Sequence, residues 1–475
     1  MSKRLLSASL MLAAVLGAPA HAQTGSARLS FTRFTFAAAD GSKTEADSAT
    51  LVVPKNRQHP ERGSILIPVV RFRATGAGAG APIIYLSGGT GSGIAAATGS
   101  RYPFLQSLRE LGDVITFDLR GAARSTPRVA CRAGEPIPVG QPMTYQMLTA
   151  LLERNARTCV LELRRADVDP AGHNIKETVE DVDALRVAVG AERVRLIGTS
   201  TGTQIGLEYL RRHSGQAERI VLLGTQAPDQ NLHSPADQER VVRTLDARNR
   251  RRAKAGEPPP DLLGSIRKVL GALEAAPQVV RVPNRSGGTT DVALGKFDAQ
   301  LIVSASLGDR RVMTALIPAL SAAAKGDYTV LAQFKMQGAR TGITSPFEAL
   351  FDCQSGAPQA RKRMVDREAN TALLGLATLD FPGSCTGWMT RELDASYREP
   401  VRSRVPVLFV SGTLDGRTPV RNAAMAAESL PNAFQLVVDG ASHGDDLFIS
   451  SPEILENVRA FLAGGRPKRS RIELP

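Results

Sequence analysis

Short apolar runs alternate with amphipathic stretches along much of the chain. Strands are predicted where four or more mostly apolar residues lie between turn residues, at 82–86, 114–117, 194–197 and 219–223. Helices are predicted between these strands, at 104–111, 177–189 and 204–212. The second helix carries Val179, Val182, Leu185 and Val189 on one stripe. This alternation predicts an α/β fold, in which helices cover both faces of a mostly parallel sheet.

The alternation stops at about residue 226 and returns with predicted strands at 405–410 and 434–438 and a helix at 453–463. Two further strands, 29–36 and 64–73, precede the alternation and predict an antiparallel edge. We therefore expect a sheet fold interrupted by an inserted, mainly helical cap. The expected divisions are a signal peptide (1–22), the first part of the core (23–225), the cap or lid (226–400), the second part of the core (401–465) and a basic, mobile tail (466–475).

The first 22 residues have the pattern of a signal peptide. Lys3 and Arg4 precede an apolar stretch, Leu5 to Gly17, and Ala20-His21-Ala22 offers the small residues that signal peptidase requires. The apolar stretch is too short to span about 30 Å of hydrocarbon, and no later run reaches about 18 apolar residues. We expect export to a periplasm or the medium, with no stable membrane anchor.

Composition is that of a globular protein, with 475 residues, 43% apolar and 22% charged. The net charge of +13 is spread along the chain, which favours solubility or attraction to an anionic envelope over a nucleic-acid partner. The most basic run, 248–254, lacks the interleaved aromatic residues that single-strand binding uses. We expect a monomer.

The four cysteines are Cys131, Cys159, Cys353 and Cys385. They form no CxxC motif and no zinc-ligand spacing, so we expect no metal site. Four thiols in an exported chain usually pair, and three pairings are possible. Cys131 with Cys159 and Cys353 with Cys385 would close the shortest loops at the lowest entropic cost. Buried free thiols are the alternative.

The segment Val194 to Gly202 contains G-x-S-x-G, with a predicted strand before it and a predicted helix after it. This context is the one a nucleophile elbow requires, because the tight turn lifts the hydroxyl of Ser200 above the sheet edge. The amide of Thr201 then lies at a helix N-terminus, where it can stabilise an oxyanion. The alternative is an ordinary turn with an incidental serine.

A nucleophilic serine needs a base, and the base needs an acid that orients it. His443 is the only histidine that follows a late strand, in the glycine-containing loop Asp439 to Gly444. Asp415 follows the strand at 405–410. The order Ser200, Asp415, His443 is that of a hydrolase triad, which needs no metal or organic cofactor.

A second oxyanion donor should come from the glycine-rich loop 86–93, and we favour the amide of Gly89. The same loop lacks the lysine of a P-loop. Gly91-Ser-Gly93-Ile-Ala-Ala96, with Asp118 ending the next strand, also fits a dinucleotide fingerprint. That alternative would leave Ser200, Asp415 and His443 unexplained.

Together these segments resemble the secreted tripeptidyl-aminopeptidase and proline-iminopeptidase-like branch of the α/β-hydrolases. The resemblance covers about 80–225 and 401–463. It rests on these motifs: Ser87 to Gly91, Asp118 to Pro127, Asn174 to Arg186, Gly198 to Thr203, Gly412 to Pro419 and Gly440 to Gly444. It implies a Ser-His-Asp hydrolase whose aminopeptidase members hold the free amine of the substrate with acids from the lid. Asp229, Asp237 and Glu239 are candidates by location only.

Two positions depart from the pattern of this branch. Thr90 stands where the family usually has proline, and Thr201 where it often has an aromatic residue. Both would line the acyl site. The resemblance and the size of the lid imply an exopeptidase that removes short N-terminal units from peptides. The two departures leave open a carboxylesterase or lactone hydrolase with the same triad. A binding protein without catalytic activity is a third possibility, disfavoured because every triad position is filled.

Overall fold

The structure is a computed structural model that describes residues 28–132, 134–253, 259–284, 287–341 and 345–474. The expected signal peptide, 1–22, lies outside these residues. Ten strands form one sheet in the order β1-β2-β3-β5-β4-β6-β7-β10-β11-β12. Their bounds are β1 Thr32–Ala37, β2 Lys43–Pro54, β3 Ser64–Phe72, β4 Ile83–Leu86, β5 Val114–Phe117, β6 Val194–Ser200, β7 Ala217–Thr225, β10 Val407–Gly412, β11 Ala433–Asp439 and β12 Arg471–Glu473.

The strands β5, β4, β6, β7, β10, β11 and β12 pair in parallel in this order. The strands β1, β2 and β3 form an antiparallel edge next to β5. The strands of the parallel part are almost entirely apolar and buried, as expected for a sheet covered on both faces. The predicted fold class and antiparallel edge are therefore confirmed.

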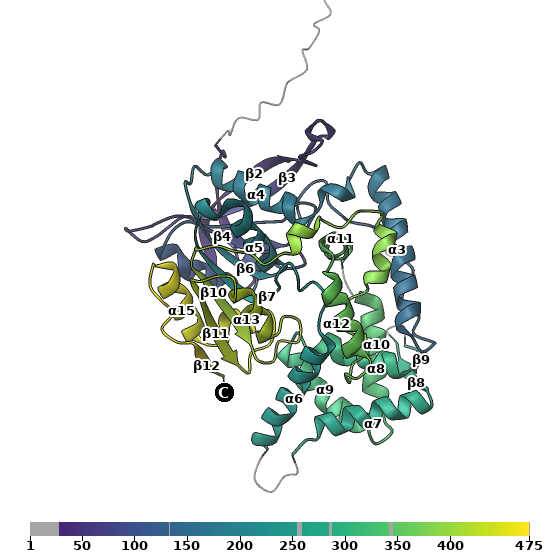
Figure 1. The fold of residues 1–475 in the computed structure, drawn as a ribbon. Helices are drawn as coiled ribbons and strands as arrows, with labels where there is room; N and C mark the ends of the chain where they lie inside the picture. The colour runs from purple at the N-terminus through teal and green to yellow at the C-terminus, as the bar shows by residue number, and fades with distance from the viewer. Residues whose placement is uncertain (1–27, 133, 254–258, 285–286, 342–344, 475) are drawn as a thin grey trace, which may run out of the picture.

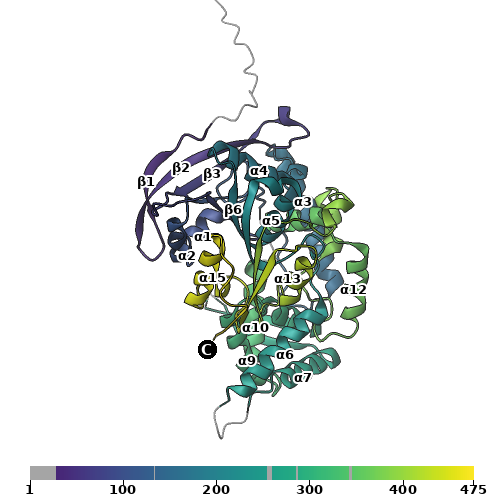
Figure 2. The same ribbon diagram turned by 60° about the vertical axis from the view of Figure 1, so that its left-hand side comes forward.

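Helices cover both faces of the sheet, as Figure 2 shows. One layer contains α4 (Ile175–Ala188), α5 (Thr201–His213) and α13 (Val420–Ala427). The opposite layer contains α1 (Gly93–Thr98), α2 (Tyr102–Ser107), α14 (Asp446–Ile449) and α15 (Pro452–Leu462). The stripe of Val179, Val182 and Leu185 on α4 is fully buried in the first layer, which is why that helix lies against the sheet.

Between β7 and β10 the chain leaves the sheet and forms a second apolar cluster of its own. Figure 1 shows these elements to the right of and below the sheet. The helices are α6 Pro235–Arg251, α7 Leu262–Ala275, α8 Lys296–Ser306, α9 Arg310–Ala323, α10 Thr329–Thr341, α11 Pro346–Ser355 and α12 Gln359–Ala369, followed by the 3₁₀ segments η5 Pro382–Trp388 and η6 Ala395–Arg398. They are joined by α3 (Tyr145–Arg165), which comes from before β6 and contacts η5.

Residues 226–400 are mainly helical, as expected, and they also contain an antiparallel hairpin of β8 (Gln278–Pro283) and β9 (Thr289–Leu294). One expectation about local structure was wrong. The basic tail is not free, because β12 pairs in parallel with β11 and buries Ile472. An isolated apolar residue between charged ones gave no strand signal, and the edge of β11 supplies the missing hydrogen bonds.

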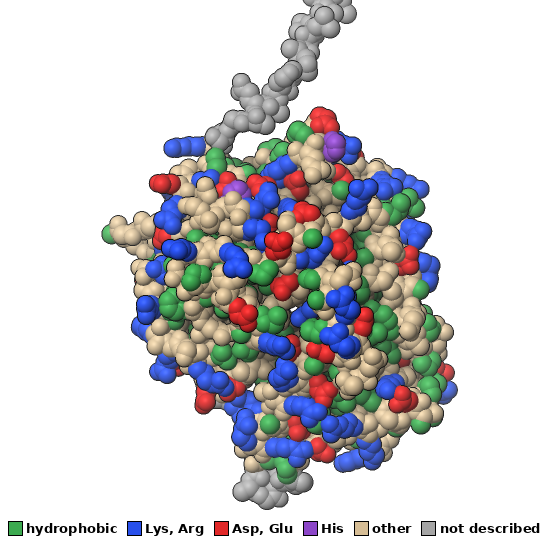
Figure 3. All heavy atoms as spheres, in the orientation of Figure 1, with side chains coloured by type: hydrophobic (Ala, Val, Ile, Leu, Met, Phe, Trp, Pro, Cys, Tyr) green, Lys and Arg blue, Asp and Glu red, His purple; other side chains and the backbone are tan. Residues whose placement is uncertain are grey.

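The cysteines pair as expected, Cys131 with Cys159 and Cys353 with Cys385. The first disulfide ties the segment after β5 to α3, and the second ties α11 to η5. On the face drawn in Figure 3, basic and acidic side chains are interspersed. None of the described helices is long and apolar enough to cross a membrane.

Candidate active site

Ser200 stands at the turn between β6 and α5. Its backbone has φ 52° and ψ −125°, a conformation that a residue with a side chain rarely adopts. A Cβ placed on Gly88 would lie 3.1 Å from the Cβ of Ser200, so the facing loop approaches closely only because residue 88 has no side chain. The structure therefore places the serine on a strained strand-to-helix turn, as the motif predicts.

Asp415 and His443 are in direct contact. Asp415 Oδ2 lies 2.8 Å from His443 Nδ1, and the carboxylate is fully buried. Its Oδ1 accepts the backbone N–H groups of Arg417 at 2.9 Å and Thr418 at 2.8 Å, and the Thr418 hydroxyl donates to Oδ2 at 2.7 Å. Burial alone would raise the pKa of Asp415, but the charge and hydrogen bond of His443 and the donors of Thr418 hold it below its usual value. The carboxylate is therefore kept ionised beside the imidazole.

The strand register brings this pair to Ser200. In the β6–β7 ladder Ser200 lies opposite Thr225, and a Cβ placed on the preceding residue, Gly224, would lie 2.9 Å from His443 Cε1. Neighbouring strands are about 4.8 Å apart, so the imidazole lies over the strand end next to the serine. Among the described residues the Ser200 hydroxyl makes no hydrogen bond to His443, and such contacts are often long in unliganded sites. All three residues lie at the carboxyl edge of the sheet.

The glycine-rich loop lies beside Ser200, where the second oxyanion donor was expected. The Gly91 N–H donates to the Gly88 carbonyl at 2.8 Å, which closes a tight turn around Gly89. Thr201 is the first residue of α5. The amides of Gly89 and Thr201 remain our predicted oxyanion donors.

Asp118, the acid of the alternative dinucleotide fingerprint, is not available to bind a ribose. Asp118 is buried, and its two oxygens accept the backbone N–H groups of Ile94 at 3.1 Å and Arg124 at 3.2 Å. The carboxylate therefore holds two loops together and does not face a ribose.

Three acids that the sequence analysis missed converge near this site. Glu348 and Asp352 lie one turn apart on α11, and the carboxylate of Glu348 occupies the place where a Cβ on Gly89 would be. Asp380 accepts the backbone N–H of His233 at 2.6 Å and lies 2.8 Å from its Nδ1. The spacing of Glu348 and Asp352 is visible in the sequence, but which face of the helix meets the oxyanion loop is not.

Two of the three candidates chosen by location are paired with other residues. Asp237 is paired with Arg240, and Glu239 with Arg243 and the backbone N–H of Leu373. Asp229 is partly buried, and burial raises its pKa despite the charge of Arg361.

Two of the three acids in this cluster lack a partner that would balance their charge. The side chains of Glu348 and Asp352 make no hydrogen bond or ion pair with any residue that the structure describes. Burial raises the pKa of Asp352 well above its usual value, and the charges of Glu348 and Asp380 raise it further. Within the described ranges no group of three or more His, Cys, Asp or Glu residues is placed to hold a metal ion. A bound organic cation would relieve the repulsion.

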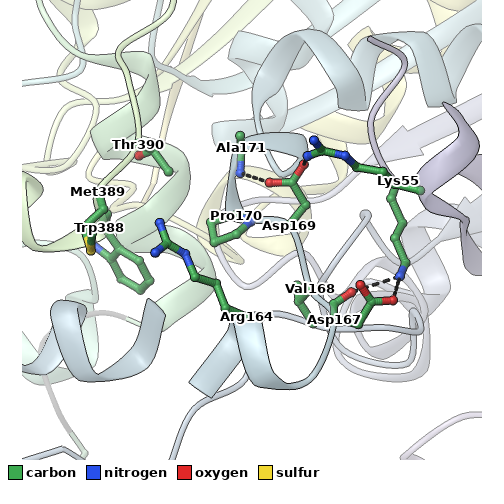
Figure 4. Close-up of a pocket in the computed structure, with 11 residues that line it drawn as sticks. Lys55, Arg164, Asp167, Val168, Asp169, Pro170, Ala171, Trp388, Met389 and Thr390 are labelled. Atoms are coloured by element: carbon green, nitrogen blue, oxygen red, sulfur yellow. Dashed lines mark hydrogen bonds and ion pairs between the residues drawn. The ribbon is translucent and has the colours of Figure 1, made fainter. Parts of the chain in front are cut away.

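A cavity of about 620 Å³ begins at this cluster. Asp352 and Asp380 line it together with both disulfides and the apolar side chains of Leu152, Phe381 and Trp388. Another cavity, of about 580 Å³, lies between Lys55, Arg164 and Trp388 (Figure 4). Its lining includes none of the triad residues, and Lys55 is already bonded to Asp167. The lining of the first cavity also lacks the triad residues, but unlike the second it contains two acids of the cluster, Asp352 and Asp380.

The chain matches the profile of the alpha/beta hydrolase fold over residues 81–445. It therefore belongs to this family. Within the family it is a serine hydrolase, and it is 25% identical over 448 residues to serine protease Hip1 of Mycobacterium tuberculosis, covering 87% of this chain and 84% of that protein.

Two further similarities are weaker. A putative hydrolase of Escherichia coli, YuaR, is 29% identical over 163 residues, which is 33% of this chain and 31% of that protein. The crystal structure of proline iminopeptidase from Mycobacterium smegmatis overlays with a TM-score of 0.41 at 17% identity, covering 87% of this chain and 97% of the other.

Proposed function

We propose that Ser200, His443 and Asp415 form the catalytic triad. The Ser200 oxygen attacks a substrate carbonyl carbon while His443 takes the hydroxyl proton, and Asp415 holds the imidazolium that forms. The amides of Gly89 and Thr201 donate to the oxyanion. His443 then gives the proton to the leaving amine, and water hydrolyses the acyl-enzyme.

We further propose that the substrate is a peptide with a free N-terminus and that residues 226–400 form the cap that selects it. The observation that carries this proposal is the cluster of Glu348, Asp352 and Asp380, in which Glu348 touches the oxyanion loop at Gly89 and neither Glu348 nor Asp352 has a partner among the described residues. Carboxylates so placed would hold an ammonium group within reach of the scissile bond. A simple ester has no group that uses them. Similarity to a serine protease over most of the chain supports a peptidase.

A substrate panel on the chain from residue 23 tests this proposal. We expect hydrolysis of alanyl and trialanyl anilides, and a loss of at least about 100-fold in kcat/KM when the same anilides are N-acetylated, because acetylation removes the charge that the acids pair with. Initial rates of aniline release measure both. If short acyl esters are hydrolysed and neither free nor acetylated anilides are, the enzyme is an esterase or lactone hydrolase.

Asp352 should also give amine recognition a pH dependence. Because the pKa of Asp352 is raised, its side chain is mostly neutral below that pKa and becomes a charged carboxylate as the pH rises through it. We expect KM for the free-amine anilide to fall with rising pH while the substrate amine stays protonated, and Asp352→Asn to raise KM and flatten this fall.

The N-acetylated anilide and Glu392→Gln serve as controls for Asp352→Asn. Glu392 lines the same cavity but pairs with Lys362, so its replacement should leave the KM profile unchanged. The same slope in the wild type and in Asp352→Asn would remove Asp352 from amine binding.

A further inference from the structure

Arg417 lies two residues after Asp415, on the same loop. This loop joins β10 to α13, and the backbone N–H of Arg417 donates to Asp415. The neighbouring Gly416 N–H donates to the Leu307 carbonyl at 2.9 Å, which fixes the loop to the turn between α8 and α9. A Cβ placed on Gly308 would lie 3.0 Å from Arg417 Nε, so the side chain runs along this turn beneath the cap.

The guanidinium group has no partner among the residues that the structure describes. The structure gives it no hydrogen bond, ion pair or aromatic contact, although the residue is partly buried. Arg120 shows the usual arrangement in this protein: it is fully buried and donates to Asp181 and to the carbonyls of Lys55 and Gly172. The five N–H donors of this guanidinium are therefore available to a ligand with acceptor oxygens.

The acids near Arg417 do not serve as that ligand. Burial lowers the pKa of Arg417, and the charges of Glu348, Asp415 and Asp380 oppose this, so all three carboxylates act on the guanidinium. None forms an ion pair with it, and Asp415 is committed to His443 and Thr418. The site therefore has a negative pole above the oxyanion loop and a separate positive pole on the Asp415 loop.

The proposed reaction determines which end of the substrate lies near the acid cluster and which lies near Arg417. The acyl part of the substrate is held at the oxyanion loop, which Glu348 touches. The leaving amine takes its proton from His443, so the leaving part lies on the side of the loop that carries Asp415 and Arg417.

We propose that Arg417 binds the C-terminal carboxylate of the leaving part, and that the preferred substrates are short peptides with both termini free. The proposal rests on the proposed aminopeptidase function. A planar guanidinium can bind a carboxylate through two parallel hydrogen bonds, which a lysine or an amide cannot reproduce.

The test compares Ala-Ala-Ala with Ala-Ala-Ala-amide, followed by the release of new amine. Wild type should cleave the free acid with a kcat/KM at least about tenfold higher than the amide. Arg417→Gln should bring this ratio to about one, and Arg417→Lys should give an intermediate ratio. Arg421→Gln, which removes an exposed cation four residues away, should keep the wild-type ratio. Labelling of Ser200 by a fluorophosphonate shows that each variant keeps its site.

Three outcomes separate the possibilities. Equal rates for acid and amide in the wild type overturn the proposal without any variant. An equal loss on both peptides in Arg417→Gln also overturns it, because the side chain would then support the enzyme and not the substrate. If neither the peptides nor the free-amine anilides are cleaved but short acyl esters are, the aminopeptidase function itself has failed.

Discussion

Replacing Ser200 with alanine is expected to lower kcat on the best substrate by a factor on the order of 10⁶, the size of loss seen when a catalytic serine is removed. The variant should fold normally, because alanine keeps the Cβ and the Ser200 hydroxyl makes no hydrogen bond with another described residue. Labelling by a fluorophosphonate, followed as an added mass on the intact chain, should disappear. Thermal unfolding should stay within a few degrees of the wild type.

Ser214→Ala is a matched control, since Ser214 is an exposed serine just beyond the far end of α5. It should keep full activity and labelling. Undiminished hydrolysis by Ser200→Ala would refute the assignment of the nucleophile, and with it the proposed triad.

The sequence was most informative where chemistry requires a special backbone. The glycines around Ser200, the turn at Asp415 and the loop of His443 are short local patterns that can be recognised without knowing the fold. The alternation of apolar strands and helices predicted a mostly parallel sheet, because buried parallel strands leave a strong local signal. The predicted strands of the parallel part are present in the structure.

The rest depends on contacts between distant segments, which a local pattern does not contain. β2 (Lys43–Pro54) begins with polar residues, and β12 is a strand only because β11 offers an open edge. Glu348 and Asp352 look like ordinary polar residues of an amphipathic helix until α11 is placed over Gly89. Arg417 likewise becomes notable only when no partner is found for it in three dimensions.

Asp415→Asn is expected to reduce kcat by about 10⁴-fold, as it does in other serine hydrolases where the acid orients the base. The reason lies in the donors around this side chain. Oδ2 faces His443 Nδ1 and the Thr418 hydroxyl, while Oδ1 faces the N–H groups of Arg417 and Thr418. An asparagine must turn its NH₂ group toward one of these two sides, and both sides consist of donors.

If the NH₂ group faces the two backbone N–H groups, a buried donor is left opposite other donors, which costs about 1–3 kcal/mol. If it faces His443, the imidazole must accept at Nδ1 and carry its proton on Nε2, where it can no longer take the proton of Ser200. Single-turnover acylation should therefore slow as much as kcat. Asp439→Asn is the matched control, because Asp439 ends the neighbouring strand and bonds Thr413 and Arg471 away from the imidazole. Asp415→Asn with kcat within a few-fold of the wild type would show that another group orients His443.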